Sequence, residues 1–168
     1  MRLLIYGAGV IGSFYATLFS KAGYDTYVYA RGKRLDSLKA CGLLYMENGR
    51  IKKASVSILS KLYEDDIFDF IFVTVRENQV CSALSELKSN RSKCIVTMVN
   101  STGDYKKWEK FCGKGRILPA FPGAGGSIKD DILDASLTSR LIQPTTFGEF
   151  SCKNSKRLKM LSNIFKKS

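Results

Sequence analysis

The stretch MRLLIYGAGVIGSFYATLFSKAG (residues 1–23) decides the fold of this chain. It starts with a short apolar run, Leu3–Tyr6, that is typical of a buried strand. Three glycines in the pattern G-x-G-x-x-G follow directly, and apolar residues at helical spacing then continue over Val10–Ala22. A strand, this glycine pattern and an amphipathic helix, in that order, are the first half of a dinucleotide-binding βαβ unit.

Each glycine has a separate role in such a loop. Gly7 allows the tight turn from strand to helix, Gly9 leaves space for a diphosphate to approach the backbone, and Gly12 lets the helix pack closely on the strand. The N-terminus of the helix presents free backbone N–H groups and its positive dipole end to the anion. The alternative is a glycine-rich helix start without a ligand. The predicted diphosphate-binding residues are Gly7, Ala8, Gly9, Val10, Ile11 and Gly12.

The residues after the second predicted strand, Thr26–Ala30, indicate which dinucleotide binds. A site for NAD usually carries Asp or Glu there to accept hydrogen bonds from the ribose hydroxyls. This chain has three cations instead, Arg31, Lys33 and Arg34. A guanidinium can bind a 2′-phosphate through two parallel hydrogen bonds, so we predict NADP(H), with Arg31 as the main ligand of that phosphate. Lys33 and Arg34 could equally belong to a solvated helix start.

The rest of the chain alternates short apolar runs with segments of helical period. This alternation predicts an α/β fold, a doubly wound and mostly parallel sheet with helices on both faces. Asn48-Gly49 is a strong turn signal between two strands. Phe121–Gly126 (FPGAGG) is expected to be a glycine-rich loop, and Ser139–Gln143 and Thr145–Phe150 are expected to be short strands. The further predicted strands are Leu43–Met46, Ile51–Val56, Phe70–Val75, Cys94–Val99 and Arg116–Ala120, and the further helices are Arg34–Cys41, Glu77–Leu87 and Tyr105–Phe111.

Several motifs together resemble the N-terminal domain of the ketopantoate reductase family. The motifs are MRLLIYGAGVIGSFYA, YARGKRL, FIFVTVRENQV, VTMVNSTG and QPTTFGE, and they span most of residues 1–150. The resemblance implies a Rossmann-type domain that binds NADP(H). It further implies an NADPH-dependent oxidoreductase of pantothenate biosynthesis, a 2-dehydropantoate 2-reductase that reduces the 2-oxo acid ketopantoate to pantoate. Reduction of another 2-oxo acid, or a non-catalytic dinucleotide-binding or redox-sensing module, are the alternatives.

Three more cofactor-binding residues follow from the resemblance alone. The family usually has a Lys followed closely by Gln after its third main strand, and these positions are Arg76 and Gln79 here. Arg keeps the charge of Lys but not its compact shape. The family's Asn-Gly-x-Gly, near nicotinamide and substrate, reads Asn100-Ser101-Thr102-Gly103, so Asn100 matches and Ser101 departs.

The resemblance also implies a second, helical domain that supplies the catalytic Lys and other substrate-binding groups. We expect residues 1–150 to be the NADP(H)-binding domain and residues 151–168 to be a basic linker helix towards that domain, which is missing here. The catalytic residue is therefore expected outside this chain, which should be inactive in isolation. The apolar stripe of the tail (Leu158, Leu161, Ile164 and Phe165) has no obvious partner within residues 1–150.

Composition limits the other functions. The chain has 168 residues, a net charge of +12 and no His, which excludes a Ser-His-Asp triad and His-ligated metals, and we expect no metal site. Five cysteines without C-x-x-C spacing indicate a reducing, cytoplasmic location. There is no apolar run long enough to span a membrane. The positive charge suggests nucleic acid, but no recognition motif accompanies it, so we expect a phosphate pocket and a basic helix instead.

Overall fold

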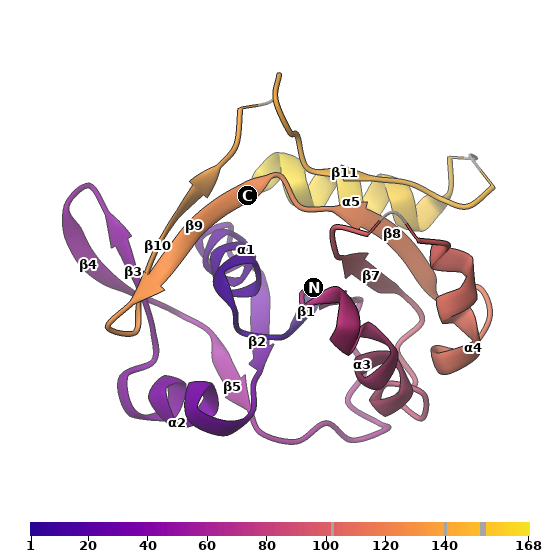
Figure 1. The fold of residues 1–168 in the computed structure, drawn as a ribbon, viewed down its shortest axis with the longest axis horizontal. Helices are drawn as coiled ribbons and strands as arrows, with labels where there is room; N and C mark the ends of the chain where they lie inside the picture. The colour runs from indigo at the N-terminus through magenta and orange to yellow at the C-terminus, as the bar shows by residue number, and fades with distance from the viewer. Residues whose placement is uncertain (102, 140, 152–153) are drawn as a thin grey trace.

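The computed structural model describes residues 1–101, 103–139, 141–151 and 154–168. Its main element is a large sheet with the strand order β11-β8-β7-β6-β1-β2-β5 (Figure 1). All neighbours pair in parallel except β11, which is antiparallel to β8. The predicted doubly wound, mostly parallel α/β fold is therefore confirmed. The strands are β1 Arg2–Tyr6, β2 Asp25–Tyr29, β5 Ser57–Leu59, β6 Phe70–Val73, β7 Ile95–Met98, β8 Ile117–Phe121 and β11 Thr146–Phe147.

Helices cover both faces of this sheet because its central strands are apolar on both sides. In β1, Leu3 and Ile5 join the hydrophobic core under α1 and α5, whereas Leu4 and Tyr6 join the core under α3 and α4. This alternation follows from the two-residue period of a strand. The helices are α1 Val10–Lys21, α2 Gly32–Cys41, α3 Val80–Glu86, α4 Glu109–Cys112 and α5 Lys156–Lys167, with short 3₁₀ turns at Glu77–Gln79 (η1) and Tyr105–Trp108 (η2).

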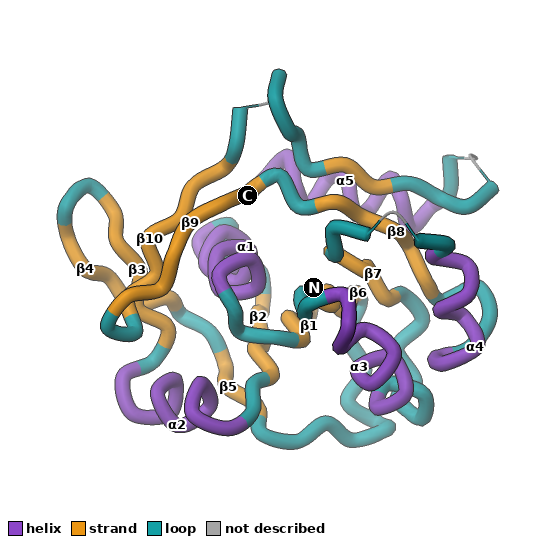
Figure 2. The backbone as a smooth tube through the Cα atoms, viewed as in Figure 1, coloured by secondary structure: helices purple, strands orange, loops and turns teal. Residues whose placement is uncertain are grey.

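A second, four-stranded sheet of order β4-β3-β10-β9 arches over α1 (Figure 2). The predicted turn at Asn48-Gly49 is confirmed, since both residues have positive φ (51° and 73°) between β3 and β4. β3 then pairs in parallel with β10, which the sequence did not indicate. The strands are β3 Leu43–Glu47, β4 Arg50–Ala54, β9 Ala124–Lys129 and β10 Ile132–Leu137.

Three expectations about residues 121–150 differ from the structure. Phe121–Gly126 is not a loop throughout, because β8 runs to Phe121 and β9 begins at Ala124. A Cβ on Gly126 would lie 2.3 Å from Asp134 O of β10, so glycine here permits close strand pairing rather than a flexible loop. Ser139–Gln143 has no strand among its described residues, and Ile142 and Gln143 N–H donate to Ser139 O in a turn. Of Thr145–Phe150, only Thr146–Phe147 forms a strand.

The expectation that the apolar stripe of the C-terminal tail lacks a partner is also wrong. The tail forms α5, and its Leu161 and Ile164 are buried in the same core cluster as α1. The ring of Phe165 lies 5.4 Å from that of Phe19 in α1. The physical reason is that α1 covers only part of this face, and Val96 of β7 and Leu118 of β8 need a second helix to bury them.

Candidate functional site

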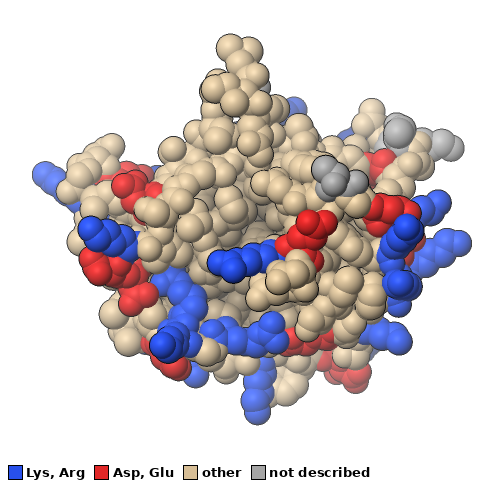
Figure 3. All heavy atoms as spheres, viewed as in Figure 1, with Lys and Arg blue, Asp and Glu red and all other residues tan. Residues whose placement is uncertain are grey.

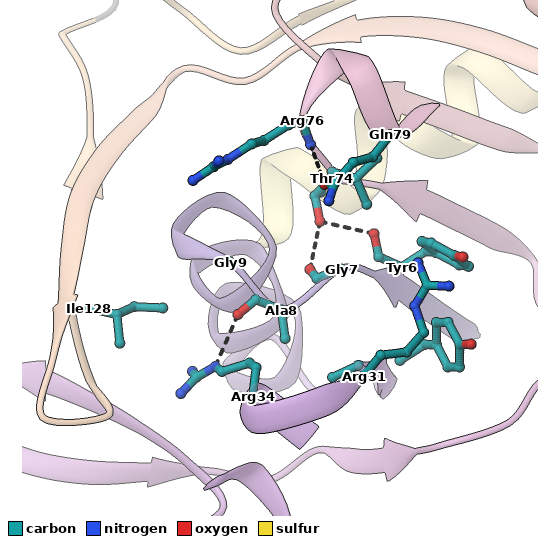
Figure 4. Close-up of a pocket in the computed structure, with 13 residues that line it drawn as sticks. Tyr6, Gly7, Ala8, Gly9, Arg31, Arg34, Thr74, Arg76, Gln79 and Ile128 are labelled. Atoms are coloured by element: carbon teal, nitrogen blue, oxygen red, sulfur yellow. Dashed lines mark hydrogen bonds between the residues drawn. The ribbon is translucent and has the colours of Figure 1, made fainter. Parts of the chain in front are cut away.

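A cavity of about 410 Å³ opens at the carboxyl ends of β1, β2 and β6 (Figure 4). In the sheet, β1 has β2 on one side and β6 on the other, so the order in which the chain adds strands reverses at β1. The cavity lies at this point. Open parallel sheets bind their ligands at such switch points. The lining residues are Tyr6, Gly7, Ala8, Gly9, Tyr29, Ala30, Arg31, Arg34, Thr74, Val75, Arg76, Gln79 and Ile128.

The glycine loop has the geometry that a diphosphate site requires. Gly7 has φ +110°, and a Cβ on Gly12 would lie 1.9 Å from Gly7 O, so only glycine fits at both positions. A Cβ on Gly9 would meet no heavy atom within 4 Å, so this side of the loop is open. The first N–H groups of the 12-residue helix α1 have no intrahelical acceptor and are available to an anion.

Side chains from two other elements hold the loop in this shape. Thr74 Oγ1, just after β6, donates to Gly7 O at 2.8 Å (Figure 4). Arg34 Nε donates to Ala8 O at 3.1 Å, and Arg34 Nη1 pairs with Asp131 Oδ1 at 3.2 Å. Asp131 belongs to the turn between β9 and β10, so Arg34 connects the glycine loop to the second sheet. Its side chain is only 20% exposed, which rules out the solvated helix start that the sequence left open.

Arg31 lies at the other end of the cavity, next to two buried tyrosines. Its guanidinium carbon is 6.0 Å from the ring centroids of both Tyr6 and Tyr29. The two hydroxyls donate to the carboxylate of Glu86, the last residue of α3, and Arg31 Nη1 is 3.3 Å from Glu86 Oε2. Burial and the hydrogen bond to Glu86 raise the pKa of Tyr29 to about 12, and the pKa of Tyr6 is raised by the same causes.

The structure brings most, but not all, of the predicted site residues together. Gly7, Ala8, Gly9, Arg31, Arg76 and Gln79 line the one cavity. Val10, Ile11 and Gly12 form the first turn of α1 behind it. Arg76 extends into the cavity, and its backbone N–H donates to Gln79 Oε1 at 3.3 Å (Figure 4). Asn100 lies exposed after β7 and does not line the cavity. Thr102, in the same motif, lies outside the described residues.

Four residues that line the cavity or hold its arginines were not predicted from the sequence: Thr74, Glu86, Ile128 and Asp131. Thr74 is the last residue but one of the predicted strand Phe70–Val75, and a polar residue near that carboxyl end was a usable signal. Glu86 and Asp131 had no such signal, because each approaches its arginine through the tertiary fold. Ile128 lines the cavity from β9, a strand that was itself not predicted.

The rest of the described surface is mixed in charge. On the face shown in Figure 3, acidic side chains are interspersed with Lys and Arg. Among the described residues, no three His, Cys, Asp or Glu side chains are placed to hold a metal ion. The helices in the described part of the chain are all too short or too polar to cross a membrane.

Comparison with known proteins defines the class of this chain. The family model "Ketopantoate reductase PanE/ApbA" matches residues 3–151. The chain therefore belongs to the ketopantoate reductase family, a family of oxidoreductases, as its sequence motifs predicted.

A curated relative agrees with this assignment, and solved structures agree with the fold. The chain is 30% identical over 129 residues to a 2-dehydropantoate 2-reductase of Archaeoglobus fulgidus, covering 77% of this chain and 42% of the relative. Its fold is similar to a 2-dehydropantoate 2-reductase of Geobacter metallireducens (TM-score 0.81, 19% identity, 99% of this chain and 55% of the other). It is also similar to a D-mandelate dehydrogenase solved with NADH and anilino(oxo)acetate (TM-score 0.78, 20% identity, 99% and 54%). The chain thus spans about half or less of the length of these proteins.

Proposed function

We propose that this chain is the NADP(H)-binding domain of a reductase that acts on a small 2-oxo acid, with ketopantoate as substrate and pantoate as product. The observation that supports it most strongly is a single cavity lined by the glycine loop and by three arginines, Arg31, Arg34 and Arg76. Three cations suit a cofactor with a diphosphate and a third, 2′-phosphate group. The choice of ketopantoate rests on the family and on the names of its members.

Each end of the cavity suits a different part of the cofactor. The open side of Gly9 and the free N–H groups of α1 would hold the diphosphate. Arg31 would bind the 2′-phosphate at the end of β2, and Arg76 and Gln79 would contact the ribose or phosphates between them. Asn100, beyond the cavity, would lie near nicotinamide and substrate. When bound, NADPH supplies the hydride, and these residues orient it and hold its charge.

The reduction itself belongs to a longer protein in this proposal. Hydride transfer to a ketone also requires a proton donor at the carbonyl oxygen, held in place with the nicotinamide. In the family that donor is expected in a helical second domain, and the tail beyond residue 150 would lead towards it. The 168 residues alone are therefore expected to bind NADPH without reducing ketopantoate. A domain that binds dinucleotides for another purpose, such as redox sensing, is the competing function.

The substitution Arg31→Ala tests this assignment. Removing the guanidinium should weaken NADPH binding about ten- to hundredfold, since a hydrogen bond to a charged group is worth ~1.5–3 kcal/mol. NADH lacks the 2′-phosphate, so its dissociation constant should change little. Titration of the chain with each dinucleotide, followed by cofactor fluorescence, measures both constants.

Lys33→Ala is the matched control, because Lys33 is exposed and does not line the cavity. It should leave both constants unchanged. Equal weakening of NADPH and NADH by Arg31→Ala would refute the role of Arg31, and failure of the unsubstituted chain to bind either dinucleotide would refute the proposed function. Oxidation of NADPH by ketopantoate with this chain alone would contradict the division between two domains.

A further inference from the structure

An acidic residue lies beside the arginine that is proposed to bind the 2′-phosphate. Glu86 ends α3 and reaches the carboxyl ends of β1 and β2, where Arg31 Nη1 is 3.3 Å from its Oε2. The sequence has no acid at the tip of β2, which was the reason to predict NADP(H). The tertiary fold places one there from another element.

Two buried hydroxyl groups fix this carboxylate in place. Tyr6 donates to Glu86 Oε2 and Tyr29 donates to Oε1, and the two tyrosines are 1% and 5% exposed. Their ring centroids are 4.8 Å apart and the ring planes are tilted by 44°, so the two tyrosines contact each other beneath the carboxylate. Because the pKa of each hydroxyl is raised, both remain protonated donors at neutral pH. Glu86 would have to break these two hydrogen bonds to turn away from Arg31.

Arg31 therefore has two competing anionic partners. Its side chain is 58% exposed and contacts Glu86 through one nitrogen, so most of its donors remain free for a phosphate. A 2′-phosphate bound to Arg31 would carry about −1.5 to −2 charges and would lie close to a carboxylate that two hydrogen bonds hold in place. A ribose hydroxyl at the same place has no charge to repel.

We propose that Glu86 is a specificity-determining residue that limits the preference of this site for NADPH over NADH. The proposal rests on the proposed function, because it presupposes that Arg31 receives the 2′-phosphate. The carboxylate offsets part of the attraction of Arg31 for the phosphate, whereas the 2′-hydroxyl of NADH carries no charge for it to repel. The site is accordingly less selective than the three arginines of the cavity alone would make it.

The isosteric substitution Glu86→Gln tests the proposal. It removes the charge and keeps an amide of the same shape, whose oxygen can accept from one tyrosine hydroxyl and whose N–H can donate to the oxygen of the other. The dissociation constant for NADPH should fall about fivefold, a shift expected from removing one repulsive charge at a partly screened distance. The constant for NADH should stay within about twofold of its original value, because no charge lies at its 2′ position. Fluorescence titration at one fixed ionic strength gives both constants.

Two further variants make the result decisive. Asp65→Asn removes the acid from an exposed pair with Arg91 (2.6 Å) away from the cavity, and it controls for the change in net charge. Tyr29→Phe keeps the charge of Glu86 but removes one of its anchors, and it should raise NADPH affinity by less than Glu86→Gln. If Glu86→Gln does not fold, as judged by circular dichroism, the NADPH affinity of Tyr29→Phe is the test of the proposal.

The outcomes separate this proposal from the proposed function. Stronger NADPH binding in Glu86→Gln, with unchanged NADH binding and no effect of Asp65→Asn, supports it. Unchanged or weaker NADPH binding in Glu86→Gln, or in Tyr29→Phe if Glu86→Gln does not fold, overturns the proposal. If the unsubstituted chain binds no dinucleotide, the proposed function itself fails. If it binds NADPH but Glu86→Gln behaves like Asp65→Asn, only the role of Glu86 fails.

Discussion

Gly9 and Gly12 lie three residues apart in the same glycine motif, but their surroundings differ. The space around Gly12 is filled by the protein itself, because Gly7 O and Thr74 Oγ1 would lie 1.9 Å and 2.4 Å from an added Cβ. The space around Gly9 is empty within 4 Å. Gly12 therefore serves the packing of α1 on β1, whereas Gly9 faces open space, where the proposed function places the diphosphate.

Alanine at these two positions should give opposite results. Gly12→Ala should lower the free energy of unfolding by about 1–3 kcal/mol or more, as overpacking of a close contact does. Gly9→Ala should change stability by less than about 1 kcal/mol, since the added methyl group meets no atom and only the helix cap is affected. It should nevertheless weaken NADPH binding markedly.

Urea unfolding and dinucleotide titration of the two variants measure the two effects. Each variant is the control for the other, because both add the same methyl group within the same glycine motif. Normal NADPH binding by Gly9→Ala would show that the open side of Gly9 is not where the diphosphate lies.

At the scale of single residues, the site residues that depend on nearby sequence were predicted, and those that depend on the tertiary fold were not. The glycine loop could be predicted because the tight turn and the close approach of α1 to β1 depend on residues that are near each other in the sequence, so a short motif reveals them. Arg31 was predicted from its place after β2. Glu86 was not, because its meeting with Arg31 depends on how α3 packs over the tyrosines of β1 and β2.

At the scale of elements, α5 is held by a polar contact as well as by its apolar face. Arg157 Nη2 lies 2.6 Å from Glu149 Oε2, and Arg157 also donates to the backbone carbonyls of Gly115 and Ile117. Ser155, the N-cap of α5, donates to the other oxygen of Glu149 at 2.5 Å. This cluster ties the first turn of α5 to the segment after β11 and to the beginning of β8.

The cluster should make stability depend on pH. The hydrogen bond from Arg157 holds the pKa of Glu149 below its ordinary value of 4.5. The Glu149 carboxyl group thus binds a proton less readily in the folded state than in the unfolded state. The stabilisation that the ionised carboxylate gives the folded state is complete above pH 4.5 and is lost as the pH falls through the folded-state pKa. Glu149→Gln should be less stable than the unsubstituted protein at neutral pH, and the difference should shrink in acid.

Urea midpoints measured across that range check the prediction. Glu64→Gln, at an exposed position, is the control and should run parallel to the unsubstituted protein at all pH values. A difference between Glu149→Gln and the unsubstituted protein that does not change with pH would mean that Glu149 acts without its charge.

Elements that pair with neighbours in the sequence were predicted better than those that pair at long range. The hairpin of β3 and β4 follows from Asn48-Gly49, and the buried strands β6 and β7 follow from their apolar runs. The pairing of β3 with β10 joins segments from opposite halves of the chain, and no local pattern records it. The packing of α5 on the α1 face has the same origin, since an amphipathic stripe shows that a helix needs a partner but not which one.

At the scale of the whole molecule, the two core clusters lie on opposite faces of one sheet. One contains residues of α1, α5 and the second sheet, for example Leu133 of β10 and Leu161 of α5. The other lies under α3 and α4 and packs against Trp108, the single tryptophan of the sequence. Because both clusters share the strands of the large sheet, we expect residues 1–168 to unfold as one cooperative unit, with α5 as part of it.

The substitution Leu161→Ala tests this cooperation from the far side of the sheet. Leu161 is fully buried, so its truncation should lower the free energy of unfolding by about 2–5 kcal/mol. In urea, the midpoint followed by Trp108 fluorescence should fall by the same amount as the midpoint followed by circular dichroism, although Trp108 belongs to the other cluster. Lys159→Ala, at an exposed position of the same helix, should shift neither. If α5 acted only as a linker, Leu161→Ala would leave the Trp108 midpoint unchanged, because the nucleotide-binding domain would unfold independently of it.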